Sequence, residues 1–273
     1  ILMKQFLKYT LATIVGIMIA SVISMLIFFG VLGSLLSSRE TVTTLKPNSV
    51  YQLDLKGSLV ERSKDDPFSA LFSGTIGSET SIGLDDILAN IQKAESDPNI
   101  IGIRLNCGAL SGGYASVKEI RDALTDFKES GKFIVAYADS YTQKMYYLAS
   151  VADEIYLNPV GALSFNGISS STVFYKDLLS KLGIEMQVVK VGEFKSAVEP
   201  YIDTKMSDAN RKQVSVYINS IWNNLLNEVS ESRGISVEQL NTYADEALDF
   251  RPTEKMVEYG FVDALLYNTQ VEE

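Results

Sequence analysis

The 273-residue chain contains no histidine and one cysteine, Cys107. The lack of histidine excludes a Ser-His-Asp triad, a Cys-His pair and every metal site with a histidine ligand. The single cysteine excludes an internal disulfide and a zinc cluster held by thiolates. There is also no run of basic residues, and the net charge is -10. This charge argues against nucleic-acid binding, which needs clustered lysine and arginine. We expect no metal and no cofactor.

A long segment without charged residues lies near the N-terminus, from Tyr9 to Ser38. A bilayer-spanning helix needs about 20 apolar residues, and this segment exceeds that length. Lys4 and Lys8 precede it, so the positive-inside rule places the N-terminus in the cytoplasm and exports the rest. A cleaved signal peptide is the alternative, but its apolar core is usually about 7–15 residues and no clear A-x-A site follows. We predict an uncleaved membrane anchor in residues 1–38, contacting lipid through residues 9–38, then a stalk at 39–48 and one domain at 49–273.

The exported part alternates between strand-like and helix-like segments. Strands are predicted at 49–61, 99–106, 132–138, 153–158 and 185–191, and helices at 84–94, 116–131, 141–152, 172–183 and 213–234. A short helix with a closing strand is predicted at 253–265, a turn at Gly57, and a loop or flap at 62–82. This alternation is typical of βαβ units, so the predicted fold class is α/β with a mostly parallel sheet.

The segment GALSGGYAS, residues 108–116, joins a predicted strand to a predicted helix. Free N–H groups around Gly112 and Gly113 would suit an oxyanion or a peptide carbonyl. An ordinary turn with Ser116 as the helix cap is equally compatible with the pattern and is commoner. No serine of the chain lies in a G-x-S-x-G motif. Cys107 closes an apolar strand and is predicted to be a buried, unreactive thiol.

Lys195 lies in the segment VGEFKSAVEPYID, residues 191–203. A lysine acts as a general base only when burial or nearby positive charge lowers its pKa toward neutrality. Phe194 could help to exclude water here, and the Ser196 hydroxyl could orient the amine. Glu199 would instead keep the lysine charged if the two side chains paired. From its chemistry alone, the residue is more simply interpreted as a surface lysine, because lysines are mostly exposed.

This segment is one of three that together resemble a known family. With YYLASVADEIYLNPVGALSFNGIS (146–169) and SDANRKQV (207–214), it is similar to signal peptide peptidase A, a family of membrane-anchored Ser-Lys proteases with a ClpP/crotonase-like fold. The resemblance extends from the anchor to about residue 268. It implies that Lys195 is the general base and that Ser196 and Glu199 are supporting residues of the motif around it. It also implies that the substrates are remnant signal peptides in the membrane.

The resemblance further implies that part of the active site is missing. In the long form of the family, a first repeat carries the lysine and a second repeat carries the serine, in a turn of the Ala-Ser-Gly-Gly-Tyr type. The corresponding turn here reads SYTQKMYYLAS, which places Gln143 at the position of the nucleophile and Lys144 and Met145 at the glycines. The chain therefore resembles a first repeat, and we expect a fragment or a natural truncation. Family members form rings, so a homotetramer on the periplasmic side of the inner membrane is expected.

Two other functions are compatible with some of these observations. A catalytically inactive, membrane-anchored scaffold or peptide-binding pseudoprotease would explain the missing nucleophile. The presence of Lys195 inside its full motif favours the protease. A crotonase-like acyl-CoA enzyme is disfavoured, because acyl-CoA is not available outside the cytoplasm.

Overall fold

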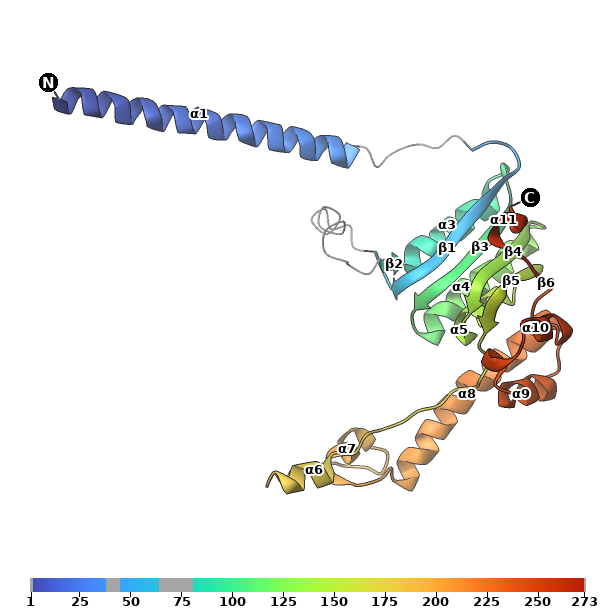
Figure 1. The fold of residues 1–273 in the computed structure, drawn as a ribbon. Helices are drawn as coiled ribbons and strands as arrows, with labels where there is room; N and C mark the ends of the chain where they lie inside the picture. The colour runs from blue at the N-terminus through green and yellow to red at the C-terminus, as the bar shows by residue number, and fades with distance from the viewer. Residues whose placement is uncertain (1, 38–44, 64–80, 273) are drawn as a thin grey trace. The chain divides into compact units, whose positions relative to one another are not determined.

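The computed structural model describes residues 2–37, 45–63 and 81–272, and the chain divides into two compact units, Ile1–Lys46 and Pro47–Glu273. The first unit contains the helix α1 (Leu2–Ser37) (Figure 1). Within α1, Met3–Val31 is long and apolar enough to cross a membrane. Its length and composition are those of a membrane anchor or a signal sequence. Most of the predicted stalk, and residues 64–80 of the predicted flap, lie outside the described residues.

The second unit is built around one six-stranded sheet (Figure 1). In spatial order its strands are β2 (Ser81–Gly83), β1 (Ser49–Val60), β3 (Ile100–Ser111), β4 (Phe133–Tyr141), β5 (Glu154–Leu163) and β6 (Ala264–Leu265). All neighbouring strands are parallel. The predicted α/β class with a parallel sheet is therefore confirmed, together with the apolar N-terminal helix.

One face of the sheet carries the core of this unit. Its connecting helices are α3 (Leu84–Ser96), α4 (Tyr114–Glu129) and α5 (Gln143–Ala149). Alternate strand residues point toward one face because side chains in a strand have a period of two. The buried strand residues on this face are Leu53, Leu55, Ile103, Leu105, Cys107, Ile134, Ala136, Ala138, Ile155 and Leu157. The intervening residues of β1, among them Gln52, Asp54 and Lys56, are exposed.

Residues 168–207, which we call the arm, differ from the rest of the second unit, which we call the body, in having almost no buried residues. They contain the short helix α6 (Lys176–Lys181), one turn of 3-10 helix (Ser196–Val198) and α7 (Glu199–Ile202). Glu199 is the only buried residue of the arm. Its large exposed apolar residues are Val173, Tyr175, Leu178, Leu182, Ile184, Met186, Val189, Val191, Phe194 and Tyr201.

The long helix α8 (Asp208–Arg233) connects the arm to the body, and Figure 1 shows α6 and α7 near its N-terminal end. Ser207 caps its N-terminus by accepting a hydrogen bond from the Asn210 N–H, and Gly234 ends it with φ +68°. Both residues follow the usual chemistry of helix ends. The chain then forms α9 (Val237–Asp245), a 3-10 turn (Leu248–Phe250), α10 (Glu254–Glu258), β6 and α11 (Asn268–Val271).

Trp222 of α8 packs against the core. Its ring lies 5.3 Å from that of Phe165, measured between centroids, and Phe165 in turn lies 5.2 Å from Phe261. The Trp222 indole N–H donates to the Asn241 side chain at 3.0 Å. Aromatic contacts of this kind stabilise the docking of α8 and α9 onto the end of the body.

Several predicted elements are wrong or shifted. Residues 185–191 form no strand, because no strand edge pairs with them, and Val189 is fully exposed. The predicted helix at 172–183 shrinks to α6. Gly57 makes no turn: β1 continues through it with φ +97° and an irregular register against β3. Helix α4 begins at Tyr114 with Gly113 as its N-cap, so Ser116 is not the cap. Helix α9 was not predicted.

Candidate functional site

A pocket of about 800 Å³ lies at the carboxyl ends of the central strands. Strands β3 and β4 pair only as far as Asn106 and Tyr137, although both continue beyond these residues. Carboxyl ends of parallel strands are the usual place for ligand sites in α/β sheets. The lining residues are Gly57, Ala109, Leu110, Ser111, Tyr114, Thr142, Gln143, Lys144, Ser164, Asn166 and Gly167.

Gln143 is the first residue of α5 and lies in the wall of this pocket. The helix starts here because the Thr142 hydroxyl caps it, accepting from the Met145 N–H at 3.3 Å. Oε1 of Gln143 accepts hydrogen bonds from the N–H groups of Asn166 and Gly167, both at 2.9 Å. Its Nε2 donates to the Gly167 carbonyl at 3.1 Å and to the Tyr114 hydroxyl at 3.2 Å. The carboxamide of Gln143 is therefore fully engaged.

The glycine-rich turn lies at the edge of the same pocket. The carbonyl of Gly112 accepts a hydrogen bond from the Lys144 ammonium, which also lies 5.0 Å from the centre of the Tyr114 ring. A side chain at Gly112 would meet Leu59 at 3.0 Å, so the turn packs tightly against β1. Gly113 precedes the first turn of α4. The predicted role of these two glycines toward an oxyanion stays a prediction.

Lys195 lies elsewhere, on the arm. It is exposed, precedes the 3-10 turn at Ser196–Val198 and does not line the pocket at Gln143. Ser196 beside it is half-buried. Lys195 and Glu199 do not form an ion pair, although both are among the described residues. The structure therefore does not bring the predicted base together with Gly112 and Gly113.

Glu199 is held away from Lys195 by the start of α8. It is 1% exposed, and its carboxylate accepts from the Ser207 hydroxyl at 2.5 Å, the Ser207 N–H at 3.2 Å and the Asn210 side chain at 2.9 Å. Burial raises the pKa of Glu199, but the hydrogen bonds from Ser207 and Asn210 outweigh burial and leave the pKa lowered. Glu199 is thus an ionised anchor between α7 and α8.

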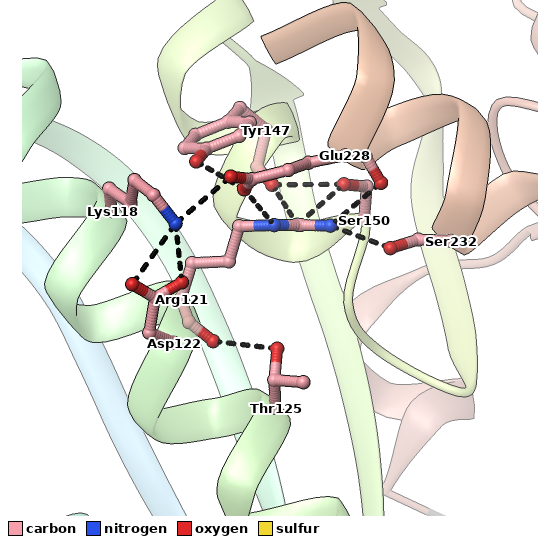
Figure 2. A network of polar contacts seen from close by, with 8 residues as sticks. All are labelled: Lys118, Arg121, Asp122, Thr125, Tyr147, Ser150, Glu228 and Ser232. Carbon is pink, nitrogen blue, oxygen red and sulfur yellow. Dashed lines mark hydrogen bonds and ion pairs between the residues drawn. The ribbon is translucent and has the colours of Figure 1, made fainter. Parts of the chain in front are cut away.

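A second polar cluster, missed by the sequence analysis, joins α8 to α4 and α5. Figure 2 shows the guanidinium of Arg121 at its centre. Arg121 is 3% exposed and forms an ion pair with Glu228 at 3.0 Å through Nε. Its terminal nitrogens donate to the hydroxyls of Ser150 at 2.8 Å and Ser232 at 2.6 Å, and to the carbonyls of Tyr147 and Glu228. All five donors of the guanidinium are therefore used.

Glu228 connects this cluster to two further side chains. Its carboxylate accepts from the Tyr147 hydroxyl at 2.5 Å and pairs with Lys118 at 2.9 Å (Figure 2). Burial raises the pKa of Glu228, but the hydrogen bonds from Tyr147 and Lys118 outweigh it and lower the pKa. The sequence could have indicated this cluster, because Arg121 follows Val117 by four residues and so lies on the apolar face of its helix.

Cys107 is buried, as predicted, with 4% of its surface exposed. Burial raises the pKa of its thiol to about 12. A thiolate is the reactive form of cysteine, so this side chain belongs to the core and not to a reactive site.

Comparison with known proteins identifies relatives for most of the chain. Residues 126–273 match the model of peptidase family S49. The chain is 38% identical over 164 residues to Protease 4 of Haemophilus influenzae, an alignment that covers 60% of this chain and 27% of that protein. It is 35% identical over 232 residues to Protease 4 of Salmonella typhi, covering 81% and 38%. It is 30% identical over 227 residues to the chloroplastic serine protease SPPA of Arabidopsis thaliana, covering 83% and 32%. The chain thus spans less than two fifths of each of these relatives.

Proposed function

This chain belongs to peptidase family S49, and from that premise we propose that it is the base-carrying repeat of a membrane-anchored serine protease. In this proposal Lys195 is the general base, and the nucleophilic serine lies on a second repeat. The relatives, which are more than twice as long as the aligned region, leave room for such a repeat. The assignment of the base and the nucleophile to different repeats rests on Gln143. This residue has no hydroxyl, and its carboxamide is fully hydrogen-bonded.

The position of Lys195 suits a base that serves another repeat. The side chain is exposed on the arm and is not engaged by Glu199, which the start of α8 holds. A lysine becomes a base when its surroundings exclude water and disfavour the ammonium. We propose that the second repeat, or a second copy of the chain, covers Lys195 and the exposed apolar residues beside it, among them Val191 and Phe194.

The reaction would be acyl transfer to serine. The neutral amine of Lys195 takes the proton of the serine hydroxyl as the oxygen attacks the peptide carbonyl. Backbone N–H groups stabilise the oxyanion that forms, and the lysine ammonium returns the proton to the departing amine. Water then hydrolyses the acyl-enzyme, with the same lysine as base. An amine has no tautomers to fix, so this chemistry needs no histidine and no aspartate partner.

The substrates in this proposal are remnant signal peptides in the membrane. Helix α1 is a candidate anchor for such a protease, with Met3–Val31 long enough to span a bilayer. We propose that α1 lies in the inner membrane and that the body faces the periplasm, as Lys4 and Lys8 before the apolar segment indicate. The anchor would keep the active site close to peptides that leave the bilayer.

The arm supports the further proposal that the protein self-associates, as a tetramer in its full-length form. A contiguous segment with ten large apolar residues exposed is unusual for a monomer and marks an interaction surface. Val216 and Tyr217 in the first half of α8 are exposed as well, at 64% and 65%. Covering these residues would supply the burial that the arm does not obtain within one chain.

A catalytically inactive, peptide-binding scaffold is the alternative function. The same observation at Gln143 favours it, because this chain contains no serine at the position of the nucleophile.

Labelling with a serine-directed fluorophosphonate tests whether the nucleophilic serine lies on a second repeat. We expect no labelling of this chain and labelling of the longer polypeptide that contains a second repeat. A labelled serine within residues 1–273 would contradict the proposal, and an unlabelled longer polypeptide would favour the scaffold.

A further inference from the structure

The carboxamide of Gln143 is bound in the way that a β-strand binds a peptide group. Gly167 gives its N–H to Oε1 of Gln143 at 2.9 Å and receives Nε2 on its carbonyl at 3.1 Å. A residue that exchanges both hydrogen bonds with one partner makes the pairing found between hydrogen-bonded residues of neighbouring strands. The orientation of the carboxamide is fixed, since only its oxygen can face the two N–H donors.

A second donor converges on the same oxygen. The N–H of Asn166 also lies 2.9 Å from Oε1 of Gln143. Successive N–H groups that point to one acceptor form the kind of concavity that binds anions and polarised carbonyls. Gly167 adopts φ +84° here, and a β-carbon would meet no atom within 4 Å. The backbone conformation, not lack of space, therefore calls for glycine at this position.

The surroundings leave room for a longer ligand. Asn166 and Gly167 line the pocket of about 800 Å³, together with Ser111 of β3 and Ser164 after β5. We propose that the N–H groups of Asn166 and Gly167, with the Gly167 carbonyl, form a binding site for a peptide amide. Gln143 occupies this site as an internal ligand. This inference goes beyond the proposed function, because the site binds an amide without cleaving it and acts without Lys195.

The presence of an internal ligand predicts how strongly the site binds an external amide. An intramolecular group competes with an effective concentration in the millimolar range or higher. A small external amide therefore binds weakly or not at all while Gln143 is present. Removal of the carboxamide in Gln143→Ala opens the site, and the affinity for such an amide rises at least about tenfold.

The probe is N-methylacetamide, which has the two hydrogen-bonding groups of a peptide unit. The full chain in detergent micelles, labelled with 15N at glycine and asparagine, is titrated and followed by NMR. In Gln143→Ala, saturable shifts are expected at the N–H groups of Asn166 and Gly167. In the wild-type protein and in Gln239→Ala, an exposed glutamine of α9, these signals should stay in place.

Hydrogen exchange supplies a readout that needs no added ligand. The N–H groups of Asn166 and Gly167 should be protected in the wild-type protein and in Gln143→Glu, which keeps an acceptor oxygen. They should exchange faster in Gln143→Ala, and in Gln143→Asn, whose shorter side chain does not reach. Gln143→Asn also serves if Gln143→Ala does not fold. Equal exchange in all four proteins, or equal titration shifts with and without the carboxamide, would overturn the inference.

Discussion

The body and the arm of this protein are held together by different means. In the body, ten strand residues on one face of the sheet are buried, and nine of them are aliphatic. In the arm, residues 168–207, the only buried side chain is the carboxylate of Glu199. The body follows the common pattern of a parallel sheet packed on helices. The arm exposes its apolar residues, and in our proposal another chain or another repeat covers them.

Helix α8 joins the two regions, and a polar anchor lies at each end of this connection. Near its C-terminal end, Glu228 and Ser232 bind Arg121 of the body. At its N-terminal end, Ser207 and Asn210 bind Glu199 of the arm. Polar networks with every partner satisfied fix a unique arrangement, which apolar contacts alone specify less well. The position of Lys195 therefore depends on these polar contacts as well as on the packing of Leu225, Leu226 and Val229 of α8 in the core.

Loss of the Arg121 anchor should give the largest loss of stability. Arg121→Ala removes one of the three partners of the partly buried Glu228 carboxylate and takes the Arg121 donors away from two carbonyls and two serine hydroxyls, so we expect a loss of about 3–5 kcal/mol. Urea unfolding in detergent, followed by the fluorescence of Trp222, measures it, because Trp222 reports on the docking of α8. Arg211→Ala, at an exposed position of the same helix, is the control. An unfolding midpoint equal to that of the control would show that the network contributes nothing.

A matched pair of leucines tests the comparison between body and arm directly. Leu105→Ala, at a position with 0% exposure, should cost about 2–5 kcal/mol. Leu182→Ala, at 65% exposure, should change the unfolding free energy by less than about 0.5 kcal/mol. It should instead weaken self-association of the full-length protein, measured by analytical ultracentrifugation. If Leu182→Ala unfolds the monomer, the arm has a core of its own and the comparison fails.

The Glu199 anchor should give a smaller, local and pH-dependent effect. Glu199→Gln replaces a carboxylate that receives three hydrogen bonds, at a cost of about 1–3 kcal/mol. Because the pKa of Glu199 is lower in the folded protein, its contribution is complete above the unfolded value of about 4.3. The contribution disappears as the pH falls through the folded-state pKa.

Hydrogen exchange of the Ser207 N–H group measures this effect. In the wild-type protein the Ser207 N–H, which donates to Glu199, should lose protection on acidification, and in Glu199→Gln its protection should be low at every pH. Protection that is the same in both proteins at pH 7 would contradict the role of Glu199 as an anchor.

The reactivity of Cys107 should be the smallest signal of all. With 4% exposure and a pKa of about 12, its thiol should not react with a maleimide at pH 7.5 in the folded protein. Reaction at the rate of a free thiol would show that β3 is not part of a stable sheet.

The sequence predicted the body well and the arm poorly, for a physical reason. Hydrophobic periodicity predicts an element when its apolar residues are buried within the same chain, as for Val117, Ile120 and Leu124 in α4. At 185–191 the same kind of pattern predicted a strand, but Met186, Val189 and Val191 are exposed and no neighbouring strand pairs with them. A pattern of this kind cannot distinguish burial in the chain from burial in a partner.

In the candidate site, too, some features were predictable from the sequence and others were not. The motif around Lys195 was recognisable as a segment, and Gln143 was placed at the nucleophile's position by the aromatic pair that follows it. The hydrogen bonds of Gln143 to Asn166 and Gly167 were not predictable, since they join residues 23 and 24 positions apart through backbone groups. The Glu199 anchor was also missed, because proximity in sequence suggested Lys195 as its partner.

Peptide hydrolysis by the full-length protein with Lys195→Ala tests the central claim most directly. If Lys195 is the general base, hydrolysis should fall by about 10²–10⁴-fold, while the unfolding midpoint and the oligomeric state stay unchanged. Lys181→Ala, at another exposed lysine of the arm, should retain full activity. Activity in Lys195→Ala within a few fold of the wild-type protein would contradict the account.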